Sequence, residues 1–163
     1  MAELEGIEVF AGADRLQKLP LFGTLSYDET NALASIATQE KRAKGSVVVE
    51  EEALGLALYV VVQGRARVER SSQEGVDVIG TVEEGELFGE MSLVEDLFTS
   101  ARVVAETDLE LIAIPRRPFE KLIEGNDRLA LKVYKAFCRT LSDRLRKANA
   151  LLSAKPGVIS PIT

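Results

Sequence analysis

The stretch Gly85–Glu86–Leu87–Phe88–Gly89–Glu90–Met91–Ser92–Leu93 carries the densest information in the chain. Two glycines flank a short apolar piece, and a one-turn helical pattern begins at Gly89. The first backbone N–H groups of such a turn have no partner within the helix, so they can bind an anion or a ligand hydroxyl. Glu90 lies in this turn, where its carboxylate either accepts a sugar hydroxyl or caps free N–H groups. The pattern therefore indicates a candidate small-molecule site.

A strand follows this turn. Ala101, Val103 and Ala105 alternate along it and are predicted to face inward, which places Arg102 and Val104 on the outer face. An outward Arg102 would be solvated. The alternative is an irregular junction that turns its guanidinium towards the site, since Arg102 has the same parity as Ser100.

Composition excludes several classes of function. The 163 residues suit one domain with a real core, and the net charge of −6 argues against nucleic acid as a partner. No apolar run is long enough to span a membrane, and the acidic start Met1–Glu5 does not resemble a signal peptide. We therefore expect a cytoplasmic protein.

The chain has no histidine and one cysteine, Cys138. This excludes triads that need histidine, histidine-ligated metals, and an iron–sulfur cluster held by one chain. Cys138 is expected to be a small core or interface residue. The composition therefore predicts a protein that is not an enzyme, with no cofactor and no metal.

Short β patterns separated by glycine, aspartate or charged turns fill residues 40–114. The predicted strands are Ser46–Glu50, Leu56–Gln63, Ala66–Arg70, Val76–Val82, Ala101–Ala105 and Leu109–Ile114. Short strands at near-regular spacing favour a sandwich or barrel, and a jelly roll has about eight strands.

Helical patterns flank this β region. Residues 1–12 are expected to form an arm with at most a short helical piece, and Asp14 can cap a turn through Leu16 and Leu19. Ser26 and Glu29 form a capping box for an amphipathic helix.

On the C-terminal side, a short helix is predicted over residues 116–124. Asn126 then caps a helix that runs to about Leu152 with a continuous apolar stripe. A helix of that length reaches roughly 40 Å, so the apolar residues of its far half have no core of their own to cover. Pairing with a second copy would cover them; the alternative is a helix folded fully back onto the sandwich.

Phe88–Leu93 resembles the phosphate-binding cassette of the cyclic nucleotide-binding domain family, which includes the catabolite activator protein and the regulatory subunits of cAMP-dependent kinase. Leu58–Gly64 is similar to the tyrosine-containing strand of that family. Two positions depart from its pattern: Glu52 replaces a glycine common in the family, and Thr99 stands where the family usually places its phosphate-pairing arginine.

The resemblance implies a mainly β jelly roll with flanking helices, and a long C-terminal helix that closes over the ligand and pairs with its copy in a homodimer. It marks these ligand-binding candidates: Leu87, Phe88, Gly89, Glu90, Met91, Ser92, Thr99, Ser100, Ala101 and Arg102. Glu90 matches the residue that accepts the ribose hydroxyl. The Thr99 hydroxyl offers one uncharged donor in place of the charged guanidinium of an arginine. This change would lower the affinity for a cyclic nucleotide on the order of 10²-fold. Glu90, with no cation nearby, would also repel a phosphate.

These observations predict one domain. Residues 1–39 form the arm and N-terminal helices, 40–114 the jelly roll with its cassette at 85–102, 115–152 the C-terminal helices and 153–163 a tail. The tail is too short for a DNA-binding domain. The leading hypothesis is a regulatory sensor that binds cAMP, cGMP or a related small anion and signals through its 126–152 helix to a separate protein partner. The alternative is a ligand-free interaction and dimerisation module of the same fold.

Overall fold

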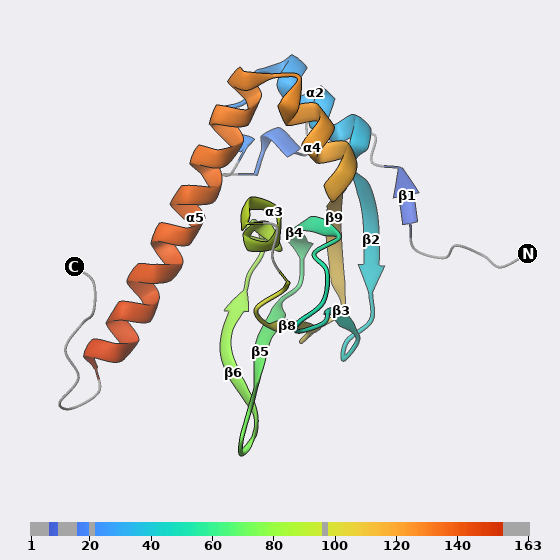
Figure 1. The fold of residues 1–163 in the computed structure, drawn as a ribbon. Helices are drawn as coiled ribbons and strands as arrows, with labels where there is room; N and C mark the ends of the chain where they lie inside the picture. Colours follow the sequence, from blue (N-terminus) through green and yellow to red (C-terminus); the bar gives the residue numbers. More distant parts are fainter. Residues whose placement is uncertain (1–6, 10–15, 20–21, 96–97, 155–163) are drawn as a thin grey trace, which may run out of the picture.

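Two antiparallel β-sheets and a set of helices make up the computed structural model, which describes residues 7–9, 16–19, 22–95 and 98–154 (Figure 1). The strands are β1 (Ile7–Val9), β2 (Thr38–Arg42), β3 (Val47–Val49), β4 (Ala57–Gln63), β5 (Ala66–Ser72), β6 (Gly75–Val82), β7 (Leu87–Phe88), β8 (Arg102–Ala105) and β9 (Leu109–Pro115). The helices are α2 (Tyr27–Ile36), α3 (Glu90–Glu95), α4 (Arg116–Glu124) and α5 (Asp127–Ser153).

The sheets have the strand orders β1-β2-β9-β4-β7 and β3-β8-β5-β6. Alternation along β4 explains how both faces of the first sheet are buried. Tyr59 and Val61 join a core that also contains Ala66 and Val103 of the second sheet, whereas Leu58 and Val60 join a core with the helices. The prediction of a mainly β fold with flanking helices and a long C-terminal helix is confirmed.

The helices begin where the sequence predicts. The Ser26 hydroxyl accepts from the Glu29 N–H, and the Glu29 carboxylate accepts from the Ser26 N–H at 2.9 Å, so the capping box is present. The Asn126 side chain accepts from the Leu129 N–H at 3.1 Å and caps α5. Both caps satisfy N–H groups that the first turn of a helix leaves without partners.

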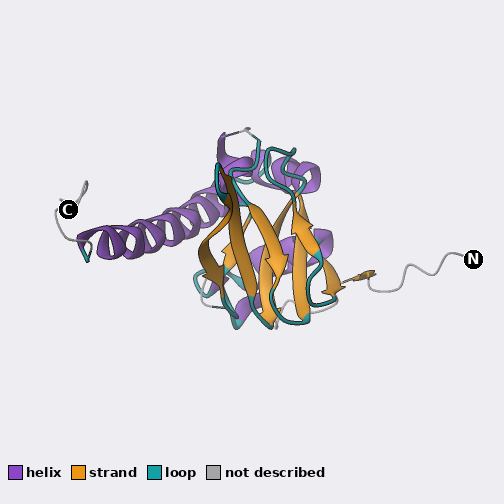
Figure 2. Cartoon of the chain, turned by 90° about the horizontal axis from the view of Figure 1, so that it is seen from below, coloured by secondary structure: helices purple, strands orange, loops and turns teal. Residues whose placement is uncertain are grey.

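α5 has two halves with different surroundings. Its 27 residues include four buried side chains, Leu129, Val133, Ala136 and Phe137, all in the first half. We call residues 127–137 the proximal half and residues 138–153 the distal half. Figure 2 shows the distal half projecting away from the strands, so the expectation of an apolar stripe that outruns the core is confirmed.

Three strands were not predicted. Ile7–Val9 pairs with β2, although residues 1–12 were expected to form an arm with at most a short helical piece. β2 has the sequence Thr-Gln-Glu-Lys-Arg and so lacks an apolar alternation, and its pairing with β1 and β9 determines its conformation. β7 has only two residues. The predicted cap at Asp14 and most of the 153–163 tail lie outside the described residues.

Candidate functional site

Gly89 sets the shape of the cassette, residues 85–102. Its φ is +90°, and a Cβ at this position would lie 2.6 Å from the Ala57 carbonyl oxygen, so only glycine fits. The preceding residues of β7 pack on opposite sides: Leu87 is buried in the core with the helices, and Phe88 stacks on Tyr59 with ring centroids 5.0 Å apart. This packing determines the direction in which the chain enters α3.

Glu90, the first residue of α3, has no exposed surface. Arg144 of α5 donates from Nη1 to Glu90 Oε1 and from Nη2 to the Leu87 carbonyl oxygen. The other carboxylate oxygen, Oε2, has no hydrogen-bond partner among the described residues. Burial raises the pKa of the Glu90 carboxyl above its ordinary value, and the charge of Arg144 opposes that rise. The site therefore contains a buried carboxylate with one oxygen bonded to Arg144 and the other without a hydrogen-bond partner among the described residues.

The expectation that Glu90 has no cation nearby is wrong, because α5 supplies Arg144. Sequence reasoning missed Arg144 since it lies 54 residues from Glu90. A signal was present: Arg144 follows Phe137 by seven positions and Leu141 by three, so it lies on the apolar stripe of α5. A charged residue on such a stripe indicates a polar partner on the surface that the stripe covers.

Thr99 connects the cassette to the loop before β4. Its hydroxyl donates to the Glu50 carbonyl oxygen and accepts from the Ala53 N–H at 3.0 Å. The Thr99 backbone N–H also donates to the Ala53 carbonyl oxygen at 2.8 Å, and its own carbonyl accepts from the Glu52 N–H at 2.9 Å. At 8% exposure, Thr99 is therefore a buried connection within the fold.

The loop at residues 50–53 has an unusual backbone. Glu52 has a φ of 55°, the left-handed region that favours glycine, at the position where the resemblance identified a replaced glycine. The two hydrogen bonds between Glu52, Ala53 and the Thr99 backbone stabilise this conformation. Glu52 and Thr99, the two residues that differ from the family pattern, are therefore direct neighbours in the structure.

Arg102 lies away from Glu90. Its Nε donates to Glu69 Oε2 at 3.0 Å, and Arg67 Nε donates to the other Glu69 oxygen at 2.6 Å. Glu69 is 5% exposed, and the hydrogen bonds from Arg102 and then Arg67 lower its pKa. Arg102 is half-buried on the outer face of its sheet, since Val103 and Ala105 fill the core between the sheets. The outward placement agrees with the sequence pattern, but the side chain is paired with Glu69 and is not simply solvated.

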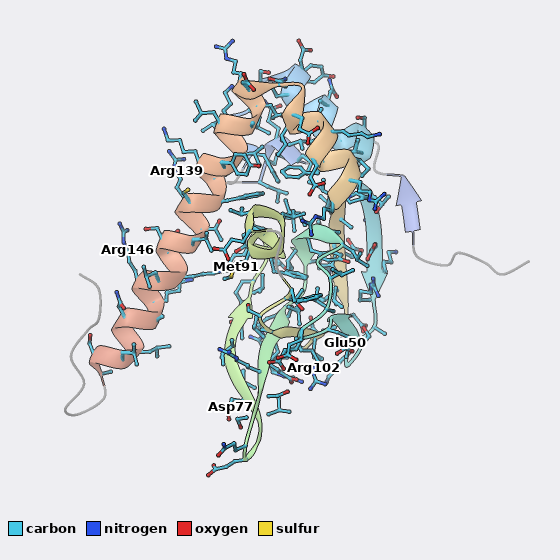
Figure 3. All side chains as sticks on the ribbon, viewed as in Figure 1. Glu50, Asp77, Met91, Arg102, Arg139 and Arg146 are labelled. Atoms are coloured by element: carbon cyan, nitrogen blue, oxygen red, sulfur yellow. The ribbon has the colours of Figure 1, made fainter. Side chains whose placement is uncertain are left out.

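A hollow of about 410 Å³ lies beside Arg102. Its lining is strongly acidic: Glu50, Glu51, Glu52, Glu69, Arg70, Ser71, Val76 and Arg102. Figure 3 shows Arg102 next to Glu50 and above Asp77, whereas Met91 lies higher, at α3 and towards α5. Two separate environments therefore lie within the region of the predicted site residues.

The first environment, next to α5, contains Leu87, Gly89, Glu90 and Met91, and the Met91 side chain is 46% exposed. Phe88 lies on the other side of its sheet, in the core between the two sheets. The Ser92 side chain lies outside the described part of the structure. Arg102 lines the second environment, and Thr99 bonds to the backbone of Glu50, which also lines it. Ser100 is exposed and Ala101 is partly buried, and neither lines the hollow. The structure does not bring the two functional groups expected to contact a nucleotide, Glu90 and Arg102, to one point.

The family model for the cyclic nucleotide-binding domain matches residues 39–126, more than half of the chain, and the chain belongs to that family. The cyclic AMP receptor protein of Thermus thermophilus is 34% identical over 80% of this chain and 59% of its own length. The cAMP-dependent protein kinase regulatory subunit of Yarrowia lipolytica is 32% identical over 66% of this chain and 28% of its own length. The chain thus spans less than two thirds of these relatives.

Solved structures agree on the fold. A cyclic nucleotide-binding domain from Methylobacillus flagellatus superposes with a TM-score of 0.77 at 22% identity, covering 93% of this chain and 84% of the other. The predicted jelly-roll architecture of this family is therefore confirmed. Among the described residues, no helix combines the length and hydrophobicity needed to cross a bilayer.

Proposed function

We propose that the chain is a non-catalytic sensor module in which a small molecule binds at the cassette and sets the position of the distal half of α5. Membership of the cyclic nucleotide-binding domain family supports a ligand related to nucleotides, with cAMP and cGMP as the first candidates. The relatives with these domains are regulatory proteins, which supports a regulatory role without chemistry of its own.

The contact between Glu90 and Arg144 carries this proposal. Glu90 is the residue that the family resemblance assigns to the ribose hydroxyl, and the structure shows the same carboxylate paired with α5. Any ligand group that contacts Glu90 changes the electrostatic environment of Arg144, because both partners share one buried carboxylate. Ligand binding is thereby coupled to the helix, since a ligand shifts an equilibrium by its different affinity for the two states.

The distal half of α5 is suited to respond. All four buried side chains of α5 lie in the proximal half, and in the distal half Leu145 is 43% exposed and Leu151 is 67% exposed. A segment with little buried apolar surface opens at low free-energy cost. Arg144, through its bonds to Glu90 and the Leu87 carbonyl, connects the distal half to the cassette.

The same exposed leucines support a homodimer formed through residues 126–152. Leu145 and Leu151 are exposed on the distal half of α5, and pairing with a second copy of the helix would bury apolar surface that a monomer leaves in water. A change in the position of α5 would then alter the dimer geometry presented to a separate protein partner.

The second candidate function is a ligand-free interaction module of the same fold. One observation favours it: Thr99 forms hydrogen bonds within the fold and Arg102 is paired with Glu69, so neither is positioned as a phosphate receptor. In this alternative, the Glu90–Arg144 pair is a permanent structural contact.

Distance measurements by pulsed electron paramagnetic resonance distinguish the two functions. Spin labels are placed at Gln73→Cys in the β5–β6 turn and at Ala150→Cys in α5, in a Cys138→Ser background diluted with unlabelled protein. The sensor function predicts that cAMP, cGMP, adenosine or guanosine changes the distance distribution, and that Arg144→Ala broadens it without ligand. A distribution that none of the four ligands alters would contradict the sensor function and support the ligand-free module.

A further inference from the structure

The Thr99 hydroxyl cannot donate to a phosphate in this structure. A hydroxyl has one proton, and that of Thr99 is donated to the Glu50 carbonyl oxygen while the oxygen accepts from the Ala53 N–H. A phosphate requires donors, so Thr99 would first have to break its connection to the loop at 50–53. The Thr99 hydroxyl, at the position expected to pair with phosphate, therefore has no proton left to donate to a ligand.

Arg102 is also unsuitable as a phosphate receptor. Both Nε and Nη2 of its guanidinium donate to Glu69 Oε2. Glu50, Glu51 and Glu52 line the same hollow, so an anion placed there would meet carboxylates on several sides. Like charges that approach closely repel, and the four carboxylates that line the hollow outnumber its two guanidiniums, Arg70 and Arg102.

Arg144 is the cation that contacts Glu90 in the described structure, and it is already bonded to Glu90 Oε1 and to the Leu87 carbonyl oxygen. A phosphate that recruited Arg144 would leave Glu90 buried, ionised and without its cation, next to the new negative charge. Leaving one partner of a buried ion pair unpaired is strongly destabilising. A negatively charged ligand would therefore have to compete with Glu90 for Arg144.

An uncharged ligand hydroxyl, unlike a phosphate, can bind to Glu90 without displacing Arg144. The Oε2 atom of Glu90 has no partner among the described residues, and Glu90 has no exposed surface. A buried acceptor without a donor costs free energy, which a hydroxyl proton relieves without adding charge. Oε1 can remain with Arg144 while Oε2 accepts from the ligand, so the ligand bond and the α5 contact can exist together.

We infer that the cassette selects an uncharged nucleoside over a cyclic nucleotide, with the 2′-hydroxyl of the ribose donating to Glu90 Oε2 while Arg144 stays on Oε1. This inference rests on the proposed sensor function and specifies its ligand class. It also gives a direction to the response, since occupation of Oε2 stabilises the same carboxylate geometry that Arg144 of α5 contacts.

Calorimetric titration of the full chain with four probes tests the inference: adenosine, guanosine, cAMP and cGMP. At least one nucleoside is expected to bind at least tenfold more tightly than its cyclic monophosphate. The 2′-deoxy form of the bound nucleoside is expected to bind at least tenfold more weakly. Glu90→Gln is expected to weaken nucleoside binding by a similar factor, and Glu95→Gln, a matched change at an exposed position of the same helix, is expected to have no effect.

Thr99→Arg provides the complementary test, with Thr99→Val as the control that removes the hydroxyl bonds to the loop without adding charge. Only Thr99→Arg is expected to raise cAMP or cGMP affinity, by about 10²-fold, because a charge-assisted fork replaces a neutral hydroxyl. Wild-type binding of a cyclic nucleotide as tight as that of its nucleoside would overturn this inference and leave the sensor function intact. No heat from any of the four probes at millimolar concentration would contradict the sensor function itself.

Discussion

Glu29 and Glu90 form a matched pair of buried glutamates with opposite behaviour. Each lies in the first turn of a helix, and each pairs with a cation of α5, Lys132 for Glu29 and Arg144 for Glu90. The hydrogen bond from Lys132, followed by that from the Ser26 N–H, lowers the pKa of Glu29 to about 2. Burial instead raises the pKa of Glu90.

The first cause of the difference is burial, which raises the pKa of Glu90 and only weakly opposes the lowering of the pKa of Glu29; the donors around each carboxylate come second. Glu29 Oε1 accepts from Lys132 Nζ at 2.5 Å and from the Ser26 N–H at 2.9 Å, so the ionised form is well stabilised. Glu90 is more costly to ionise, with Arg144 as its cation. An unpartnered oxygen alone does not mark a ligand site, because Glu29 Oε2 also lacks a partner among the described residues. The informative feature is a carboxylate that the fold stabilises incompletely within the cassette.

The two pairs also lie on different halves of α5. Lys132 lies in the proximal half, next to the buried Val133, whereas Arg144 lies in the distal half next to the exposed Leu145. Apolar burial therefore stabilises the first contact, and the second depends more on the polar interaction itself. A rigid and a responsive segment can thus share one helix, and the following changes test this division from the largest effect to the smallest.

Phe137→Ala should have the largest effect on the fold. Phe137 is 1% exposed and packs against Phe119 with ring centroids 6.1 Å apart. Its truncation should lower the free energy of unfolding by about 3–5 kcal/mol, measured by urea denaturation. Leu151→Ala, in the exposed distal half, should change it by less than about 0.5 kcal/mol. Equal losses from the two variants would contradict the division of α5.

Glu29→Gln should have an intermediate effect. It removes the charge that binds Lys132 and weakens the reciprocal cap with Ser26, so we expect a loss of about 1–2 kcal/mol of unfolding free energy in urea denaturation. Glu90→Gln has the same shape change and removes a charge whose burial is costly. The Arg144 side chain that it leaves unpaired is 33% exposed and can reach water, so a loss below about 1 kcal/mol is expected. An equal or larger loss for Glu90→Gln would contradict the difference between the two pairs.

The pH dependence of stability should differ in sign between these variants. The folded pKa of Glu29 is lowered, so its contribution is present above the ordinary value of 4.5 and is lost as pH falls towards about 2. The folded pKa of Glu90 is raised, so its contribution is present below 4.5 and is lost as pH rises through the raised value. Thermal unfolding between pH 2 and 7 checks this. Glu29→Gln should flatten the acid side of the curve, and Glu90→Gln should change the side above pH 4.5.

Leu145→Asp should have the smallest effect on the protomer, because Leu145 is 43% exposed. In the proposed dimer, however, it places a charge at the helix pairing surface, so sedimentation equilibrium should show a fall from dimer to monomer mass. Lys147→Asp, a charge change at another exposed position of the distal half, is the control and should leave the mass unchanged. A wild-type protein that sediments as a monomer would end the dimer proposal.

Much of the fold could be predicted because its signals are local. The capping box at Ser26, the cap at Asn126 and the apolar runs of the central strands each depend on nearby residues. β2 could not be predicted, since its polar sequence forms a strand through pairing with β9 across the chain. Local pattern fails where tertiary pairing determines the conformation.

The site was predictable in part for the same reason. Gly89 and Glu90 were identified from a contiguous motif, and the structure places them on the expected tight turn. The partner Arg144 is remote in sequence, and the bonds between Thr99 and the loop at residues 50–53 depend on how two segments meet in space. Sequence spacing indicated which residues carry chemistry, but it could not show which of them were already paired with one another.

Hydrogen exchange measured by mass spectrometry shows whether Arg144 controls the distal half of α5 through Glu90. Arg144→Gln is compared with wild type and with Arg146→Gln, a change at an exposed neighbour. Arg144→Gln is expected to accelerate exchange in residues 141–153 and to leave exchange in residues 129–137 unchanged, while Arg146→Gln is expected to have no effect. Unchanged exchange in residues 141–153 of Arg144→Gln, or an equal increase in both halves, would contradict control of the distal half by Arg144 through Glu90.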